Sequence, residues 1–273
     1  MLYLVPTPIG NLGDISDRMR RALEEADFIA AEDTRVTMKL LNHLGISKPL
    51  VSYYEHNREK SGQRILERML QGETCALVSD AGTPAISDPG EDLVRLCAEA
   101  GVPVTAIPGP CALITALCIS GLPTGRFTFE GFLSVNQKSR RAHLKDLEHE
   151  TRTMIFYEAP HKLMATLQDF AQTFGQDRRI SLCRELTKLH EEALRTTMAG
   201  ALAHYKETAP RGEYVLVVEG AQPKEEEALT LEQALAMVQE QIAHGKSKKD
   251  AVRSVSELTG FPKNTLYDAA IKA

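Results

Sequence analysis

The chain has 273 residues, of which 43% are hydrophobic and 25% are charged, and its formal net charge is −5. This composition is typical of a globular protein long enough for two domains, and it excludes a wholly disordered chain. The acidic balance also argues against a protein that coats nucleic acid non-specifically, because such binding requires clustered Lys and Arg. A local basic patch is still compatible with it.

Cysteine usage and the N-terminus bear on the compartment. The five cysteines lie in apolar stretches without a C-x-x-C pair, so we interpret them as small hydrophobic side chains and expect no metal site. Residues 1–6 lack a positively charged region and are predicted to form a first strand instead of a signal peptide. The longest mainly apolar run, residues 111–119, is too short to cross a bilayer. We therefore expect a protein of the reducing cytoplasm without membrane contact.

Short apolar runs alternate with helical patterns in the first part of the chain. Strands are predicted at residues 2–5, 28–31, 50–53, 76–79 and 102–107, and helices at residues 17–26, 37–44, 60–70 and 91–99. Asp14 or Ser16 can cap the first helix, and Gly45 suits the end of the second. Strand–helix–strand units of this size favour a mainly parallel sheet covered on both faces.

Parallel sheets of this kind bind ligands beyond the carboxyl ends of their strands. The predicted topology brings three loops to that edge, at residues 6–14, 79–90 and 108–112. We therefore predict a ligand site there, from topology alone.

The pattern restarts after residues 121–125 and indicates a second α/β domain. Strands are predicted at residues 127–132, 154–157, 180–183, 193–198 and 214–218, and helices at residues 140–147 and 163–174. The predicted domains are therefore residues 1–121 and residues 122–221, with a third segment at residues 222–273.

The third segment begins with an acidic stretch at residues 222–227, which we interpret as a solvated linker. Helices predicted at residues 231–242, 247–258 and 263–271 resemble a small helix-turn-helix module. From residue 242 onward six Lys or Arg face three acidic residues, a local charge of +3. Contact with nucleic acid and a helical cap with a solvated basic face are equally compatible with this pattern.

Several well-known motifs are absent: the phosphate-binding P-loop, the dinucleotide-binding glycine pattern, H-E-x-x-H and G-x-S-x-G. The loop at residues 79–90 instead carries small residues, Ala81, Gly82 and Ala85, which let a flat ligand approach the backbone. Asp80 and Asp88 can accept hydrogen bonds or offset a cationic centre. Residues 88–91 also suit the start of a helix, so a structural role for the loop stays open.

Polar residues follow the second and third predicted strands at the same edge. Asp33 follows another carboxylate and can pair with Arg35, or it can cap a helix. Glu55, His56 and Asn57 place a titratable ring beside a carboxylate and an amide, which suits the orientation of a hydroxyl. A His–Glu pair on the surface is the alternative interpretation.

Together these segments resemble the tetrapyrrole (corrin/porphyrin) methylase family, and within it the members that methylate the ribose of small-subunit ribosomal RNA. The matching segments are residues 6–14, 31–35, 79–90, 107–110, 156–161 and 183–188. The resemblance covers about residues 1 to 221, and the C-terminal helices fit the same subgroup. Tetrapyrrole-modifying members usually carry Gly-Asp-Pro in the long loop, whereas this chain has Ser79-Asp80-Ala81 with extra residues before Ile86. That departure favours RNA as the substrate.

The resemblance implies two α/β domains with S-adenosylmethionine folded into the cleft between them, a small C-terminal helical module and a homodimer. It implies donor contacts from Pro8, Asp80, Ala81, Gly82, Ile86, Ala112, Phe156, Tyr157 and the backbone near Gly212. The implied reaction is 2′-O-methylation of a cytidine ribose in 16S ribosomal RNA, near the decoding centre of the small ribosomal subunit.

Methyl transfer from an activated donor mainly requires alignment and the exclusion of water, but a ribose hydroxyl is a poor nucleophile until its proton leaves. We expect Asp33 to act as base or ribose ligand and Arg35 as its electrostatic partner, with Glu55, His56 and Asn57 orienting the substrate. RNA contacts are predicted for residues 247–253 and for a second basic stretch. That stretch contains Lys138, Arg140, Arg141 and Lys145.

Three other functions are compatible with parts of the sequence. A tetrapyrrole C-methylase, or a diphthine-synthase-like enzyme that modifies a histidine derivative in a protein, would use the same scaffold. The Ser79-Asp80-Ala81 sequence and the basic tail argue against both. A non-enzymatic adaptor that binds nucleic acid through its C-terminal helices would leave the three ligand-type loops unexplained.

Overall fold

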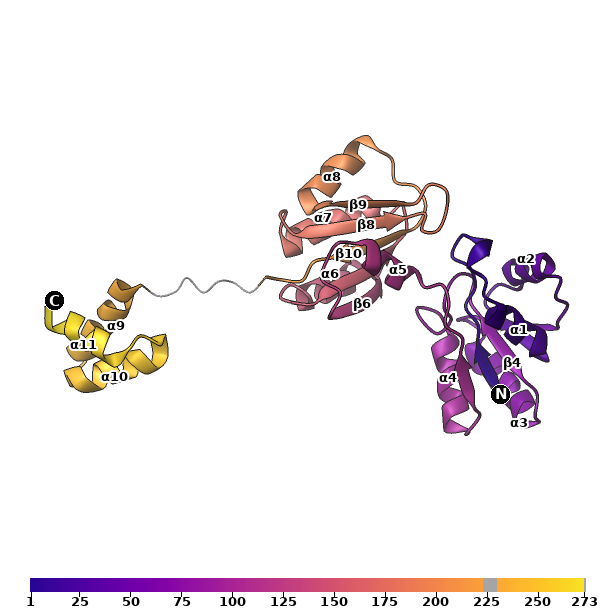
Figure 1. Cartoon of the computed structure of the whole chain (residues 1–273), viewed down its shortest axis with the longest axis horizontal. Coiled ribbons are helices and arrows are strands. Elements are labelled where there is room, and N and C mark those ends of the chain that lie inside the picture. Colours follow the sequence, from indigo (N-terminus) through magenta and orange to yellow (C-terminus); the bar gives the residue numbers. More distant parts are fainter. Residues whose placement is uncertain (223–229, 273) are drawn as a thin grey trace. The chain divides into compact units, whose positions relative to one another are not determined.

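The computed structural model describes residues 1–222 and 230–272, so most of the predicted acidic linker lies outside the described residues. The chain divides into two compact units, Met1–Ala221 and Gln222–Ala273 (Figure 1). Each unit has a hydrophobic core of its own.

Five parallel strands form the first sheet, in the order β3-β2-β4-β1-β5. The strands are β1 (Leu2–Leu4), β2 (Phe28–Ala31), β3 (Leu50–Ser52), β4 (Cys75–Val78) and β5 (Val104–Ala106). Their connections contain η1 (Leu12–Asp14), α1 (Asp17–Glu25), α2 (Thr34–Leu44), α3 (Arg58–Leu70) and α4 (Gly90–Glu99). Alternate residues of β2 and β4 enter two separate core clusters, one on each face. The predicted parallel sheet with two covered faces is therefore confirmed.

Side-chain caps set the beginnings of α1 and α2. The Ser16 hydroxyl accepts a hydrogen bond from the Met19 amide at 3.2 Å, which identifies the cap of α1 among the two predicted candidates. Helix α2 begins at Thr34, earlier than predicted, because the Asp33 carboxylate accepts the Arg35 amide at 2.8 Å. Gly45, with φ of 70°, ends α2 as predicted.

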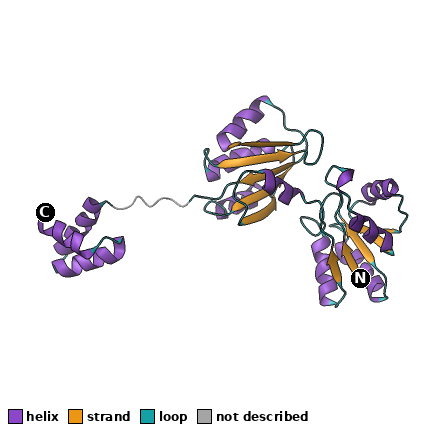
Figure 2. Cartoon of the chain, in the orientation of Figure 1, coloured by secondary structure: helices purple, strands orange, loops and turns teal. Residues whose placement is uncertain are grey.

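The second sheet has the order β6-β7-β10-β8-β9 (Figure 2, strands in orange). Its strands are β6 (Phe127–Phe132), β7 (Thr153–Glu158), β8 (Arg179–Arg184), β9 (Glu192–Thr197) and β10 (Tyr214–Val218). Strands β6 and β7 are parallel, whereas every other pair of neighbours is antiparallel. The helices of this half are α5 (Ala112–Ile119), α6 (Gln137–Asp146), α7 (Leu163–Phe174) and α8 (Met198–Glu207).

Helices α5 and α8 were not predicted. Helix α5 precedes residue 121, where the predicted boundary lies, yet its buried residues Leu113, Ala116 and Leu117 pack in one cluster with strands of the second sheet. Its sequence is apolar nearly throughout, so no polar face marks the helical period. The connection between the two sheets therefore contributes to the core of the second.

Three helices form the C-terminal unit, α9 (Leu231–Ala243), α10 (Lys248–Thr259) and α11 (Lys263–Lys272), as predicted. Thr230 begins α9 with a capping box to Gln233, and Gly260, with φ of 76°, ends α10. The buried face of each helix enters one small core that includes Val238, Val255 and Leu266. Across residues 1–222 and 230–272, no helix is long and apolar enough to cross a membrane.

Candidate functional site

The three predicted loops meet at the carboxyl edge of the first sheet. An isolated antiparallel bridge joins the first loop to the long loop: the Thr7 amide donates to the Gly82 carbonyl at 2.9 Å, and the Gly82 amide donates to the Thr7 carbonyl at 3.0 Å. The Thr83 hydroxyl donates to the carbonyl of Pro110 in the third loop at 2.8 Å. Gly82 has φ of 84°, and a Cβ there would lie 3.2 Å from the Ile9 side chain. The bridge therefore requires glycine at this position.

A cavity of about 340 Å³ opens beside this bridge, and residues from both α/β halves line it. The first half contributes Ile9, Ala81, Gly82, Thr83, Ile86, Cys111 and Ala112. The second half contributes Phe132, Tyr157, Glu158, Cys183, Glu185, Leu186, Lys188 and residues 212–215. The volume lies within the range of small-molecule sites in proteins.

Six of the nine predicted donor contacts line this cavity: Ala81, Gly82, Ile86, Ala112, Tyr157 and Gly212. Pro8 and Asp80 line a neighbouring groove instead. The ninth, Phe156, is fully buried.

Phe156 and Tyr157 face opposite sides of the second sheet. Successive side chains of a strand alternate between its faces, so both cannot reach the same cavity. The Phe156 ring lies 4.8 Å from the ring of Phe170 in the core beneath α7. The Tyr157 ring lies 5.5 Å from that of Phe132, which also lines the cavity. Burial raises the pKa of Tyr157 to about 12, so its hydroxyl keeps its proton at neutral pH.

Two loops beside the cavity hold strained backbone. In the described part of the chain, the non-glycine residues with positive φ are Ala85 (68°), Ser87 (69°), Glu185 (52°) and Thr187 (65°). Such residues persist only where their surroundings fix them, and they concentrate at functional sites. In the long loop Asp88 provides this constraint, because its Oδ1 accepts the Ala85 amide at 3.0 Å and the Gly90 amide at 2.8 Å. The loop is thus both a cavity wall and, at its end, the start of α4.

The loop after β8 lies in a segment that resembles the family, and the sequence alone predicts no function for it. The Lys188 ammonium donates to Glu185 at 2.9 Å, and its aliphatic chain crosses Gly10 of the first loop so closely that a Cβ there would lie 2.6 Å from Lys188 Cε. The Asn11 side-chain amide donates to the Thr187 carbonyl at 3.2 Å. These contacts connect the two halves around the cavity.

Asp33 and Arg35 form the predicted pair. The Arg35 guanidinium lies 2.6 Å from Asp33 Oδ2, and its hydrogen bonds hold the pKa of Asp33 down to about 2. The Asp33 amide donates to Asp80 Oδ1 at 3.0 Å, which ties the pair to the long loop. A carboxylate with so low a pKa is a weak base but a good hydrogen-bond acceptor. Burial, with the nearby carboxylates of Asp80 and Asp88, instead raises the pKa of Glu32.

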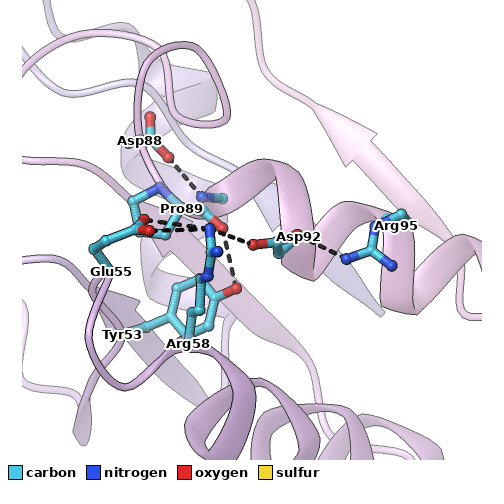
Figure 3. Close-up of polar contacts among 8 residues, drawn as sticks. Tyr53, Glu55, Arg58, Asp88, Pro89, Asp92 and Arg95 are labelled. Atoms are coloured by element: carbon cyan, nitrogen blue, oxygen red, sulfur yellow. Dashed lines mark hydrogen bonds and ion pairs between the residues drawn. The ribbon is translucent and has the colours of Figure 1, made fainter. Parts of the chain in front are cut away.

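Residues 55–57 lie outside the linings of both the cavity and the groove. Arg58 lies between Glu55 and Asp92 (Figure 3). Its Nη1 is 3.1 Å from Glu55 Oε1 and 3.0 Å from Asp92 Oδ2. Asn57 closes the turn by accepting the Tyr54 amide at 2.9 Å. The His56 side chain is exposed, with its ring 6.2 Å from that of Tyr54. Orientation of the substrate by these residues stays a prediction.

The residues of the predicted basic stretch on α6 differ in how far they are buried. Arg140 is 9% exposed, pairs with Asp169 and donates to the Thr166 hydroxyl at 2.8 Å. Its guanidinium therefore belongs to the packing of α6 against α7, and the prediction of an RNA contact for Arg140 is wrong. The side chains of Lys138, Arg141 and Lys145 are partly or fully exposed on α6.

A family model described as Tetrapyrrole (Corrin/Porphyrin) Methylases matches residues 1–202. The match includes the bridge, the long loop and most of the cavity lining. The chain belongs to the tetrapyrrole methylase family. The resemblance predicted from its loops is thereby confirmed.

Members of the family share much of this sequence. A protein of Synechocystis sp. named Ribosomal RNA small subunit methyltransferase I is 47% identical over 272 residues, which cover 100% of this chain and 98% of that protein. A protein of Halalkalibacterium halodurans with the same name is 48% identical, with 98% of this chain and 93% of that protein covered. A crystal structure of diphthine synthase, 15% identical, superposes with a TM-score of 0.60 over 80% of this chain and 89% of that one. It shares the fold.

The constraint at Asp88 gives a first prediction. Replacing Asp88 with Ala removes the acceptor for two loop amides, and we expect the free energy of unfolding of the first unit to fall by about 1–3 kcal/mol. Hydrogen exchange at residues 83–88 should accelerate in the same variant. Asp88→Asn keeps an acceptor oxygen and is the control, with less than half of the loss expected. Equal behaviour of the two variants in urea unfolding would contradict the assignment.

Proposed function

We propose that this protein transfers a methyl group from S-adenosylmethionine to the 2′ hydroxyl of a cytidine in small-subunit ribosomal RNA. The observation that carries the proposal is the cavity at the edge of the first sheet, lined by loops of the methylase family. The full-length relatives are named as ribosomal RNA methyltransferases. The reaction is an RNA methylation that uses S-adenosylmethionine.

The residues of the cavity fit this donor. The small side chains of Ala81, Gly82 and Ala112 leave room for a ligand close to the backbone, and the Tyr157 ring supplies a flat wall suited to an adenine. When bound, S-adenosylmethionine supplies a methyl group that is already activated on a sulfonium. Ile86 is 44% exposed at this cavity and would cover the donor.

The side chains next to the long loop have different tasks in the proposed reaction. Asp33 and Arg35 would position the ribose, one as acceptor and the other as a positive charge beside the developing oxyanion. Glu32 is adjacent to Asp33, and because its pKa is raised whereas that of Asp33 is lowered, its carboxylate is the stronger base of the two and we propose it as the proton acceptor. The walls of the cavity would exclude water during transfer.

The proposal extends to a homodimer that acts in the cytoplasm on the small ribosomal subunit near its decoding centre. Large apolar side chains stand exposed beside the cavity, Phe132 at 55% and Leu189 at 93%, and support contact with a second copy of the chain. Solved structures of a uroporphyrin-III-C-methyltransferase and a diphthine synthase are 18% and 15% identical to this chain, so they support the fold but not the choice of substrate.

The proposal predicts transfer of labelled methyl groups to small-subunit RNA taken from cells that lack the protein. Digestion of the product should release 2′-O-methylcytidine, whereas RNA from cells that contain the protein should accept no label at this site. A porphyrinogen and total protein serve as alternative acceptors. Label in either of these, with none in RNA, would refute the proposal.

A second prediction concerns the Asp33–Arg35 pair. We expect Asp33→Asn and Arg35→Ala each to slow single-turnover methylation by about tenfold or more, since each removes a charge beside the reacting hydroxyl. Donor affinity, measured by calorimetry, should stay nearly constant. If both variants react at the wild-type rate with donor bound, the pair has no part in the chemistry.

A third prediction concerns the C-terminal unit. Lys248 donates to the Ala270 carbonyl at 3.0 Å and Arg253 pairs with Glu257 at 3.1 Å. Lys246 donates to the neutral side chain of Gln241 at 3.1 Å, and neither Lys246 nor Lys249 is paired with a carboxylate among the described residues, so we choose these two as candidates for phosphate contacts. Replacing both with Gln should reduce the slope of log K for RNA against log salt by about 1.4–1.8. Removal of residues 224–273 should reduce it further. An unchanged slope and RNA affinity in both the double Lys→Gln variant and the truncated protein would exclude RNA contact by this unit.

A further inference from the structure

A second pocket lies beside the cavity, and it is lined by Pro8 and Asp80, the two donor contacts predicted from the sequence that are not buried and do not line the cavity. It is a groove of about 310 Å³ between the first loop and α2, lined mainly by apolar side chains. The Thr7–Gly82 bridge contributes Thr7 to the groove and Gly82 to the cavity. Along the long loop, residues 79–80 line the groove and residues 81–83 line the cavity. The two pockets therefore share one thin wall made of backbone.

The lining of the groove suits a flat ring that carries polar groups. Leu12 and Val36 are 49% and 39% exposed, an unusual exposure for apolar side chains within one small groove. Buried hydroxyls of Thr7 and Thr37 add polar atoms to the lining. Apolar walls combined with a few polar groups are typical of small-molecule sites, and here they would contact the two faces of a nucleobase.

Asp80 supplies a carboxylate where the groove meets the long loop. Its Oδ1 already accepts the Asp33 amide, which fixes the carboxylate in place and sets the Asp33–Arg35 pair next to the groove. A carboxylate is the side-chain partner that suits the exocyclic amine of cytosine, and it also accepts from a ribose hydroxyl.

Helix α2 supplies basic side chains along the same groove, of which Lys39 carries an unpaired charge among the described residues. Arg35, Lys39 and His43 are spaced by four residues, so they form one stripe on the helix, and the last two line the groove. Lys39 forms no ion pair with any residue in the described ranges 1–222 and 230–272. A row of this kind, parallel to a slot for a base, matches a nucleotide with its flanking phosphates.

We propose that this groove holds the target cytidine of the RNA, with the base between the first loop and α2 and the flanking phosphates along the α2 stripe. This inference rests on the proposed function and assigns the acceptor to the groove and the donor to the cavity. The shared wall then explains how two substrates approach each other from separate pockets.

Two variants with matched controls test the assignment. Val36→Trp fills the groove, while Met38→Trp places the same ring on α2 at an exposed position outside it. Lys39→Glu reverses a charge of the groove, while Lys60→Glu makes the same change on the exposed surface of α3. All four positions are exposed, so the fold should persist, and circular dichroism melting verifies this for each protein.

The full-length proteins are assayed with small ribosomal subunits from cells that lack the protein, and S-adenosylhomocysteine serves as the probe of the donor site. We expect Val36→Trp and Lys39→Glu to raise KM for the subunits by about tenfold or more, with donor-site Kd within about twofold of wild type. The two controls should stay within about twofold in both measurements. In wild type, 5-iodocytidine placed at the methylated position should cross-link to residues 34–43 or 8–12.

Three results would overturn the assignment. The first is an active wild-type protein together with Val36→Trp and Lys39→Glu variants that behave like their controls, or a cross-link that maps to other residues. Either outcome would contradict the assignment of the groove and leave the proposed function intact. The second is a loss of S-adenosylhomocysteine affinity in Val36→Trp, which would make the groove part of the donor site. A wild type that methylates no RNA refutes the proposed function itself, and the assignment of the groove with it.

Discussion

Two backbone hydrogen bonds between Thr7 and Gly82 determine the geometry of the whole ligand-binding edge. Strands β1 and β4 run parallel, but the bridge beyond their ends is antiparallel, so one of the two segments must reverse direction before the bridge. The Ser79 hydroxyl donates to the Gly82 carbonyl at 3.2 Å, which indicates a turn in the long loop. Only a residue that tolerates positive φ can complete this reversal, and Gly82 does so. The reversal turns neighbouring residues of one loop towards two different pockets.

The acidic residues of this edge illustrate how surroundings assign separate tasks to identical groups. Asp88 holds loop amides, Asp33 is paired with Arg35, and Asp80 accepts the Asp33 amide. Glu32 is half-buried close to Asp80 and Asp88, and these surroundings favour its protonated form. The neighbouring carboxyl groups of Glu32 and Asp33 therefore differ in the property that matters for catalysis, because the pKa of Glu32 is raised and that of Asp33 is lowered.

Much of this architecture could be predicted from the sequence. The strands of both sheets and the three C-terminal helices follow from the period of their apolar residues, and the meeting of the three loops follows from parallel topology. Sequence spacing identifies strands but not their neighbours, so the antiparallel pairing of the second sheet was not foreseen. The burial of Arg140 depends on Thr166 and Asp169, which are brought to it only by the packing of two helices. The placement of Lys188 over Gly10 likewise depends on contact between distant segments.

The alternation of side chains in the second sheet also places cavity residues next to core residues in the sequence. Tyr157, Cys183 and Val215 line the cavity, whereas their neighbours Phe156, Leu182 and Leu216 belong to the core on the opposite face. Cys183 and Val215 also pack in the cluster that contains Leu113 and Leu117 of α5, so the cavity side of the sheet contributes to folding stability as well. Tyr157 is only partly buried, so a library designed to admit bulkier synthetic donors would vary Tyr157 and leave Cys183 and Val215 unchanged.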